Sequence, residues 1–340
     1  MGMVSPSPAH DLSAAVDSCV TLARIRHPGD AVRRAATISR RLMLALAACA
    51  QAGWSREQMR AAAAPAREIF AGSQFGMRLQ TWPRGYPGDF ETVEYILDRQ
   101  NRAEPGTLAH GLEQVALDSP IAEQHRHKVH IQSRAILDAA IAHRDRPGGA
   151  RVLVLASGGA ADVRMIQDEL VELGTQVVLM DQDAEALAIA LERVPRLAPN
   201  VTTVCRNVIR GLVSVRAHGP FDLVVAGGLF DYLPDEIICR VLQQARARLL
   251  APSGQMLFTN ISIENPFRLW LECLADWCLI HRSADDVMRL CLAAGYGAGD
   301  VQVSLDPTGL ALIVRCAESS CVGQHVRDDL AVESRPVVGL

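Results

Sequence analysis

Residues 151–181 constrain the fold of this 340-residue chain more than any other stretch. Residues 152–155 form a continuous apolar run, typical of a strand buried on both faces of a parallel sheet. The run ends at Ala156-Ser157-Gly158-Gly159, small residues that let a ligand approach main-chain N–H groups. A helical pattern and a second apolar strand follow, and that strand ends at Asp181. A unit of this kind binds a nucleoside, with the ribose hydroxyls on the carboxylate.

The composition limits the classes of function. With 49% hydrophobic residues the chain can bury one large core, and a net charge of −4 without a basic stripe argues against nucleic acid as a partner. Its nine cysteines lack the spacing of a disulfide framework or a zinc site, which predicts no metal and a reducing, cytoplasmic location. No apolar run reaches the length of a membrane span, and the N-terminus lacks a signal-peptide pattern.

The chain divides at Pro147-Gly148-Gly149, a flexible joint before the first strand. Residues 1–147 are rich in helical spacing and predict a helical lid domain, whose packing could also support a homodimer. Residues 148–318 alternate strands with helices and close with an antiparallel pair. The predicted fold is therefore α/β: a doubly wound, mostly parallel Rossmann-like sheet with a C-terminal antiparallel hairpin, plus the N-terminal helical lid. Residues 319–340 predict a flexible tail.

Two helical regions carry candidate polar groups. Residues 81–96 hold a turn rich in proline and glycine, in which Asp89 is placed to cap a helix. Capping alone is one interpretation, and presentation of Arg84, Tyr86 and Asp89 to a ligand is the other. Residues 120–143 form a long helical pattern with three histidines near its start. The neighbouring Arg126 and Lys128 would repel a cation, so a solvated basic face, or a face that meets an anionic group, is favoured over a metal site.

The order of these parts resembles the class I S-adenosylmethionine (SAM)-dependent methyltransferases. The glycine-containing turn, the strand-end acid and the "LxPGG"-like bend at residues 249–255 fall where that family has them. The resemblance implies SAM as cosubstrate and a small-molecule substrate. It also implies these cofactor-binding residues: Ala156, Gly158, Gly159, Asp162, Asp181, Asn207, Gly227 and Asp231, with Arg84 and Lys128 for a carboxylate.

Two stretches carry a narrower resemblance. PRGYPGDFETVEYI (83–96) and NISIENPFRLWLECLADWCLIHRSADDV (260–287) are similar to segments of the 3-hydroxypalmitate methyl ester biosynthesis methyltransferases, and fungal carboxylate methyltransferases look alike too. This implies methyl transfer to a carboxylate, or a similar nucleophile, of a small metabolite in secondary metabolism. The residues implied to be catalytic are Tyr86, Asp89, Tyr232 and Asn260.

Two alternatives stay open. The azetidine-2-carboxylate synthases share this scaffold, and the alternative reaction is cyclisation of SAM to azetidine-2-carboxylate with release of methylthioadenosine. A non-catalytic SAM-binding partner protein is the third hypothesis. The turn itself departs from the GCGPxxE pattern of relatives, because Ala156 stands at its first position. Alanine permits a tight turn there if its φ is negative, and it narrows the approach of a ligand.

Overall fold

The computed structural model describes residues 7–317 and contains one seven-stranded sheet with helices on both faces. Strands β1 to β5 run parallel, and the last two strands pair antiparallel at one edge. In sheet order the strands are β3 (Val201–Cys205), β2 (Gln176–Asp181), β1 (Arg151–Leu155), β4 (Phe221–Ala226), β5 (Leu250–Ile261), β7 (Ala311–Ala317) and β6 (Val301–Leu305). The predicted fold class is confirmed, including the C-terminal hairpin and the N-terminal helices.

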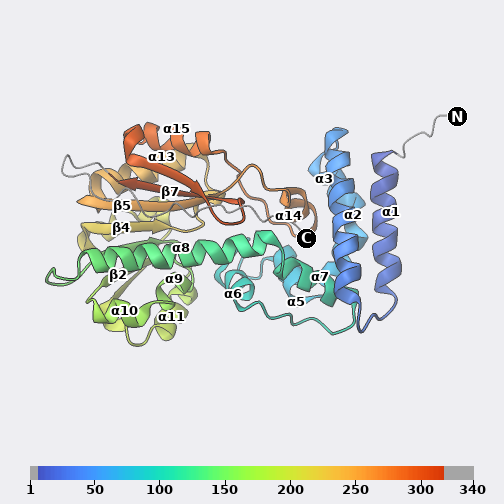
Figure 1. Ribbon diagram of the computed structural model, residues 1–340, viewed down its shortest axis with the longest axis horizontal. Coiled ribbons are helices and arrows are strands. Elements are labelled where there is room, and N and C mark those ends of the chain that lie inside the picture. Colours follow the sequence, from blue (N-terminus) through green and yellow to red (C-terminus); the bar gives the residue numbers. More distant parts are fainter. Residues whose placement is uncertain (1–6, 318–340) are drawn as a thin grey trace, which may run out of the picture.

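Two layers of helices cover the sheet (Figure 1). One face carries α8 (Pro120–Ala142), α9 (Ala161–Arg164), α10 (Gln167–Glu172) and α11 (Ala184–Arg193), and the other carries α13 (Asp235–Gln244) and α15 (Ala284–Ala293). Each layer has its own apolar core against the strands. The short helix α12 (Val208–Gly211) follows β3. The sheet is therefore buried on both faces, as continuous apolar strands require.

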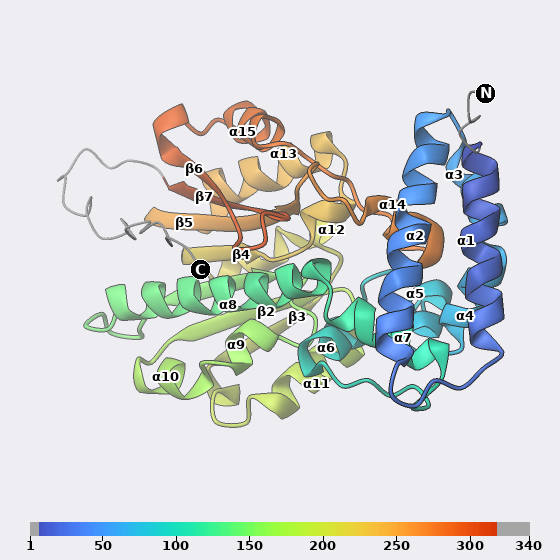
Figure 2. The same ribbon diagram turned by 45° about the vertical axis from the view of Figure 1, so that its right-hand side comes forward.

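The remaining helices form a bundle at one end of the sheet (Figures 1 and 2). They are α1 (Pro8–Ala23), α2 (Ala31–Gln51), α3 (Arg56–Ala62), α4 (Ala64–Ala71), α5 (Gln74–Thr81), α6 (Phe90–Asp98), α7 (Leu108–Leu117) and α14 (Arg268–Leu274). Helix α14 comes from the C-terminal half of the chain, and its Trp270 and Leu274 join the apolar core of this bundle. The chain thus returns to the bundle after β5 and ties the two parts together.

Local sequence explains where the helices begin. Ser119 caps α8 by accepting a hydrogen bond from Ala122 N, and Pro120 fits the first helical position because its missing N–H is not needed there. Ser7 caps α1 in the same way, by accepting a hydrogen bond from His10 N, and Pro8 occupies the first helical position. On α13 the buried residues Ile238, Val241 and Leu242 follow the spacing of one helix face.

Three details differ from the sequence-based expectations. The helix predicted after the glycine turn is split into α9 and α10, because the backbone leaves the helical region at Ile166. Strand β5 begins at Leu250, so the predicted bend at residues 249–255 lies at the start of this strand. Helix α8 packs its Ala135, Ile136 and Ala140 against β1, although it lies before residue 148. The domain boundary at residue 148 stays a prediction, and the predicted tail at 319–340 lies outside the described residues.

Candidate active site

A cavity of about 400 Å³ lies between the carboxyl ends of the parallel strands and the helical bundle. Ligands bind at this edge in open α/β sheets, at the point where the strand order reverses, which here lies between β1 and β4. The wall on the sheet side is polar and follows the strand ends: Ala156, Ser157, Gly158, Gly159, Asp162, Asp181, Gln182, Asn207, Gly227, Asp231 and Tyr232. The wall on the bundle side is apolar and includes Phe75, Leu79, Ile96, Ala116, Ile121, Trp270 and Leu271.

The turn after β1 has three residues in the left-handed region. Ala156 has φ +51°, Gly158 φ +50° and Ala160 φ +50°. The condition stated from the sequence, a negative φ at Ala156, is not met, because the chain makes its sharp turn at this residue without a glycine. A side chain there costs about 1–2 kcal/mol in the left-handed conformation.

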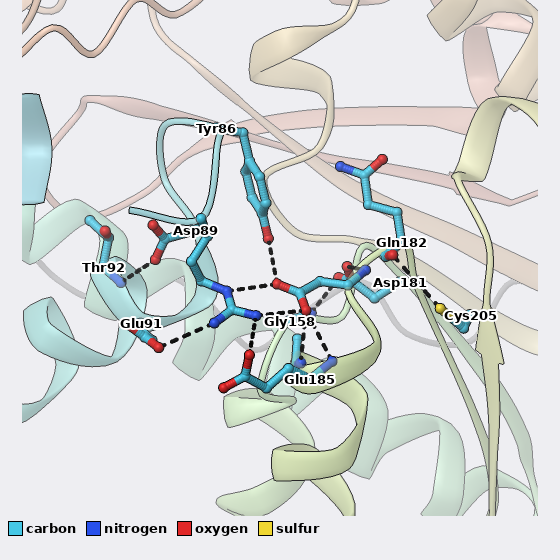
Figure 3. Close-up of polar contacts among 12 residues, drawn as sticks. Tyr86, Asp89, Glu91, Thr92, Gly158, Asp181, Gln182, Glu185 and Cys205 are labelled. Atoms are coloured by element: carbon cyan, nitrogen blue, oxygen red, sulfur yellow. Dashed lines mark hydrogen bonds and ion pairs between the residues drawn. The ribbon is translucent and has the colours of Figure 1, made fainter. Parts of the chain in front are cut away.

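Asp181 holds this turn against the next strand end (Figure 3). Its Oδ2 accepts a hydrogen bond from Gly158 N at 2.8 Å, and its Oδ1 accepts one from Asp183 N at 2.9 Å. Burial raises the pKa of this carboxyl. Asp181 lines the cavity at the end of β2, the position that the sequence predicted for a ribose-binding acid. Its hydrogen bond from Gly158 N also orients the turn after β1.

The loop before α6 packs on Asp183 and Glu185, the acidic residues that follow β2 (Figure 3). Arg84 donates to both carboxylate oxygens of Asp183, at 2.7 and 2.8 Å, and also pairs with Glu91 and Glu185. Tyr86 donates its hydroxyl hydrogen to Asp183 at 3.3 Å and lines the cavity. Burial, reinforced by nearby aspartates, raises the pKa of Tyr86. Arg84 is absent from the cavity wall, and its guanidinium anchors the loop.

Two residues predicted to be catalytic lie away from the cavity wall. Asp89 caps α6 through Thr92 N at 2.9 Å and accepts from Arg78 at 2.7 Å, which agrees with the capping interpretation. Asn260 is fully buried, donates to the Ile280 carbonyl at 2.9 Å and accepts from Arg282 at 2.7 Å. The structure thus gives both side chains partners within the fold, and their catalytic roles stay predictions.

A buried ion pair stands inside the cavity. Lys128 Nζ donates to Asp231 Oδ2 at 3.3 Å, and the other carboxylate oxygen accepts from Ile261 N at 2.6 Å. Lys128 is the single lysine or arginine among the described residues that line the cavity. The helix face around it is therefore buried against an anionic group, the second of the two predicted interpretations.

Tyr86, Tyr232 and Trp277 line the same space, as do the aromatic side chains of Phe75, Phe90 and Trp270. Trp277 Nε1 donates to the Tyr232 hydroxyl at 2.8 Å. Burial raises the pKa of Tyr232, so this phenol stays protonated at neutral pH. A Cβ on Gly88 would lie 2.1 Å from the Tyr232 hydroxyl. The absence of a side chain at Gly88 therefore makes room for the hydrogen-bonded pair of Tyr232 and Trp277.

Several polar atoms on the cavity wall lack a partner among the described residues. Ser157 Oγ and Asp162 Oδ2 are buried without a hydrogen bond, while Asp162 Oδ1 accepts from Val163 N. Burial raises the pKa of Asp162 to about 6. Unpaired buried polar atoms cost about 1–3 kcal/mol each, so they mark a surface made for a polar ligand.

The remaining predicted residues frame the cavity. Asn207 caps α12 through Ile209 N and donates to the Gln182 side chain at 2.9 Å. Gly227 accepts from the Gln132 amide at 3.2 Å, and a Cβ on Gly227 would lie 2.2 Å from Gln132 Oε1. Gly227 therefore has no room for a side chain, because α8 passes close to the end of β4.

Sequence reasoning missed the cavity face of α8. Gln124, His125 and Gln132 line the cavity beside Lys128, and the spacing i, i+1, i+4, i+8 places all four on one helix face. Gln124 Oε1 and His125 Nε2 are buried without a partner. Burial, followed by the nearby Lys128 and Arg126 charges, lowers the pKa of His125 to about 3. The helical period around Lys128 was the signal that could have found these residues.

Within residues 7–317 no group of three His, Cys, Asp or Glu side chains is placed to hold a metal ion. In the same part of the chain no helix has the length and apolar character that a bilayer crossing requires. The cavity wall carries four carboxyl groups, those of Glu94, Asp162, Asp181 and Asp231, against the one lysine. Glu94 is paired with Arg164 and Arg193, which do not line the cavity. A ligand with positive charge is therefore favoured in this site.

Comparison with known proteins agrees with this arrangement. Residues 152–254 match a methyltransferase domain. This match covers the glycine turn, the strand-end acid Asp181 and the segment after β4. No curated protein matches the chain.

Solved structures match over different lengths. A possible exported protein from Bordetella parapertussis is 18% identical, with a TM-score of 0.56, and the match covers 94% of this chain and all of that one. Its similarity shows a shared fold that includes the helical bundle. Magnesium protoporphyrin IX methyltransferase from Synechocystis PCC 6803, with bound SAH, is 10% identical over 58% of this chain and 87% of its own, with a TM-score of 0.43. A TehB-like SAM-dependent methyltransferase from Corynebacterium glutamicum is 14% identical over 58% and 96%, with a TM-score of 0.38.

Proposed function

We propose that the protein is a SAM-dependent methyltransferase that methylates a carboxylate on a small metabolite with an apolar body, in secondary metabolism. One observation carries this proposal: a single cavity joins the polar strand ends of the methyltransferase domain to an apolar chamber in the helical bundle. The first part suits SAM, and the second leaves space for an acceptor.

The sheet-side residues fit the parts of SAM. Asp181 and Asn207 would meet the ribose and the adenine, at the ends of β2 and β3. The ammonium and carboxylate of the methionine part suit Asp231 and Lys128, with the unpaired Asp162 and Ser157 atoms nearby on the wall. Tyr86, Tyr232 and Trp277 suit a sulfonium, since a cation over an aromatic face gains about 0.5–2 kcal/mol.

Bound SAM would supply a methyl group that is activated by the sulfonium charge. An acceptor carboxylate oxygen forms a bond to the methyl carbon, the carbon–sulfur bond breaks, and its electron pair stays on sulfur. No proton moves, because a carboxylate is already ionised at neutral pH. The residues of this chain then have three tasks: they align the two substrates, exclude water with the apolar wall, and stabilise the charge.

The test is a product assay with purified protein, SAM and a panel of acids with apolar chains. S-adenosylhomocysteine and a methyl ester are expected only when an acid is present. Asp181→Ala should weaken SAM binding by about 10-fold or more, because the turn loses its hydrogen-bonded support as well as the ribose contact. The matched control is Asp168→Ala, since Asp168 pairs with Arg196 at the surface. Unchanged SAM affinity in Asp181→Ala would contradict this placement.

Asp162 favours the second candidate, cyclisation of SAM to azetidine-2-carboxylate. Its Oδ2 has no partner among the described residues, and its pKa, raised to about 6 by burial, makes it a better proton acceptor than an ordinary aspartate. In that reaction the α-amine loses a proton and attacks the γ-carbon, and methylthioadenosine leaves with the electron pair of the carbon–sulfur bond. Methylthioadenosine formed from SAM alone, and lost in Asp162→Asn, would support cyclisation over methyl transfer.

A further inference from the structure

The cavity has a second polar feature that SAM does not account for. Gln124 and His125 lie one helical turn before Lys128 on α8. Three residues correspond to about 4.5 Å along a helix axis, so this pair stands beyond the ion pair as seen from the sheet. Their neighbours on the wall are apolar side chains of the bundle, such as Ile96, Ile121 and Trp270.

Both side chains lack partners that the fold could have supplied. Gln124 is 3% exposed, and its Oε1 has no hydrogen bond among residues 7–317. The His125 side chain is partly exposed, but its Nε2 atom is buried and has no hydrogen bond in the same part of the chain. Other polar side chains on α8 are satisfied: Arg126 donates to two carbonyls and to Glu123, and Ser133 donates to the Asp162 carbonyl. Buried polar groups are normally hydrogen-bonded, so two unpaired ones on the wall of one cavity favour a polar ligand there.

We propose that His125 and Gln124 form the subsite for the methyl acceptor, in which neutral N–H donors hold its carboxylate while its apolar body occupies the chamber of the bundle. This inference rests on the proposed function. A neutral imidazole donates from Nε2 when that nitrogen carries its one proton, and the Gln124 amide donates when its NH₂ group takes the place of the unpaired Oε1. These donors position a carboxylate without forming a second ion pair, and the sulfonium of bound SAM serves as its counter-charge.

The electrostatics agree with a neutral donor and argue against a base. The pKa of His125, lowered to about 3 by burial and by Lys128 and Arg126, leaves the ring uncharged above about pH 4. Such a ring is too weak a base to take a proton from an alcohol. The subsite therefore prefers an acceptor that arrives already ionised.

The test measures binding of decanoate and decanol by calorimetry in the presence of S-adenosylhomocysteine. Wild type should prefer decanoate, and His125→Phe should weaken decanoate binding by about 10- to 100-fold, as expected for a lost hydrogen bond to a charged group. His125→Asn keeps a donor and should recover part of the affinity. His130→Phe is the matched control, because His130 is exposed on the same helix. Affinity for S-adenosylhomocysteine should stay the same in all variants, which shows that each one is folded.

The outcomes separate the two proposals. If wild type binds decanoate and His125→Phe binds it equally well, or if wild type prefers decanol, the acceptor subsite is wrong while methyl transfer stands. If wild type binds S-adenosylhomocysteine but neither decanoate nor decanol, both the subsite and the proposed acceptor class are contradicted.

Discussion

Ala156 adopts a backbone conformation that is unusual for alanine, and the fold is kept. It takes the left-handed conformation that glycine would adopt at lower cost, directly after β1. The turn is held from outside, because Asp181 accepts a hydrogen bond from Gly158 N. Surrounding contacts therefore impose a backbone conformation that alanine does not favour.

Replacing Ala156 with glycine should stabilise the protein. The substitution removes about 1–2 kcal/mol of left-handed strain, and the greater flexibility of glycine in the unfolded chain takes back part of that gain. We expect a net increase of up to about 1 kcal/mol in the free energy of unfolding, measured by urea denaturation. Ala184→Gly, in the first turn of α11 where φ is helical, is the control and should destabilise. A loss of stability in Ala156→Gly would show that the methyl group makes packing contacts worth more than the strain.

The buried carboxyl of Asp162 makes the free energy of unfolding depend on pH. Its folded pKa is raised to about 6 by burial, whereas the unfolded value is near 3.8. The folded state therefore holds the proton more tightly, so stability is lost as pH rises from about 4 to about 6 and stays lost above that. Asp162→Asn cannot ionise and can still accept from Val163 N.

The free energy of unfolding of Asp162→Asn should exceed that of wild type by about 2–3 kcal/mol at pH 7.5, and this difference should shrink toward zero near pH 4. Thermal unfolding across this pH range measures it. A difference that does not change with pH would contradict the raised pKa and would point to a packing effect. The measurement is made without ligand, because a bound cation would itself stabilise the ionised aspartate.

At the scale of elements, the segment after α14 fixes the aromatic wall of the cavity. Arg282 is 3% exposed and donates to the Phe230 and Leu233 carbonyls, at 2.9 and 2.7 Å, and to Asp235. These carbonyls flank Asp231 and Tyr232. Arg282 therefore holds together the loop that carries these two cavity residues.

Removing the Arg282 guanidinium should strongly destabilise the protein. Arg282→Met leaves two buried carbonyls and Asn260 without their donor, and breaking a buried charged network of this kind costs about 3–5 kcal/mol. Arg282→Lys keeps the charge but not the planar fork, so an intermediate loss is expected. Urea denaturation measures both variants, and Arg268→Met, at an exposed i,i+4 pair with Glu272, is the control. A loss below about 1 kcal/mol in Arg282→Met would contradict this bracing role.

The elements were largely predictable from sequence, and the contacts between them were not. Apolar strand runs and glycine breaks gave the parallel sheet, and Asp89 was recognised as a cap because capping is a local interaction. The cavity face of α8 was hidden, since Arg126 and His127 interrupt it and Lys128 meets its partner Asp231 more than a hundred residues later. Likewise Asn260 matched a motif, but its partner Arg282 only becomes visible in three dimensions.

At the scale of the whole molecule, two separately packed parts share one cavity. The bundle has its own core, and α14 and the following loop anchor it through Arg67, which pairs with Asp276, and through the Gln80 contact to the Leu274 carbonyl. The apolar wall of the cavity belongs to this bundle, and the polar wall belongs to the sheet. Under the proposed function, the sheet would bind SAM and the bundle would select the acceptor.

If the bundle binds the acceptor and the sheet binds SAM, filling the chamber of the bundle should weaken acceptor binding alone. Ala116 on α7 is 7% exposed and lines the apolar wall. Ala116→Leu should place its added carbons in the chamber, so it should raise the KM for acids with long apolar chains by about 10-fold while the affinity for SAM stays unchanged. Shorter acids should be affected less. Ala188→Leu, exposed on α11, is the control. An equal loss of SAM affinity in Ala116→Leu would mean that the cosubstrate itself extends into the bundle, and would contradict this division.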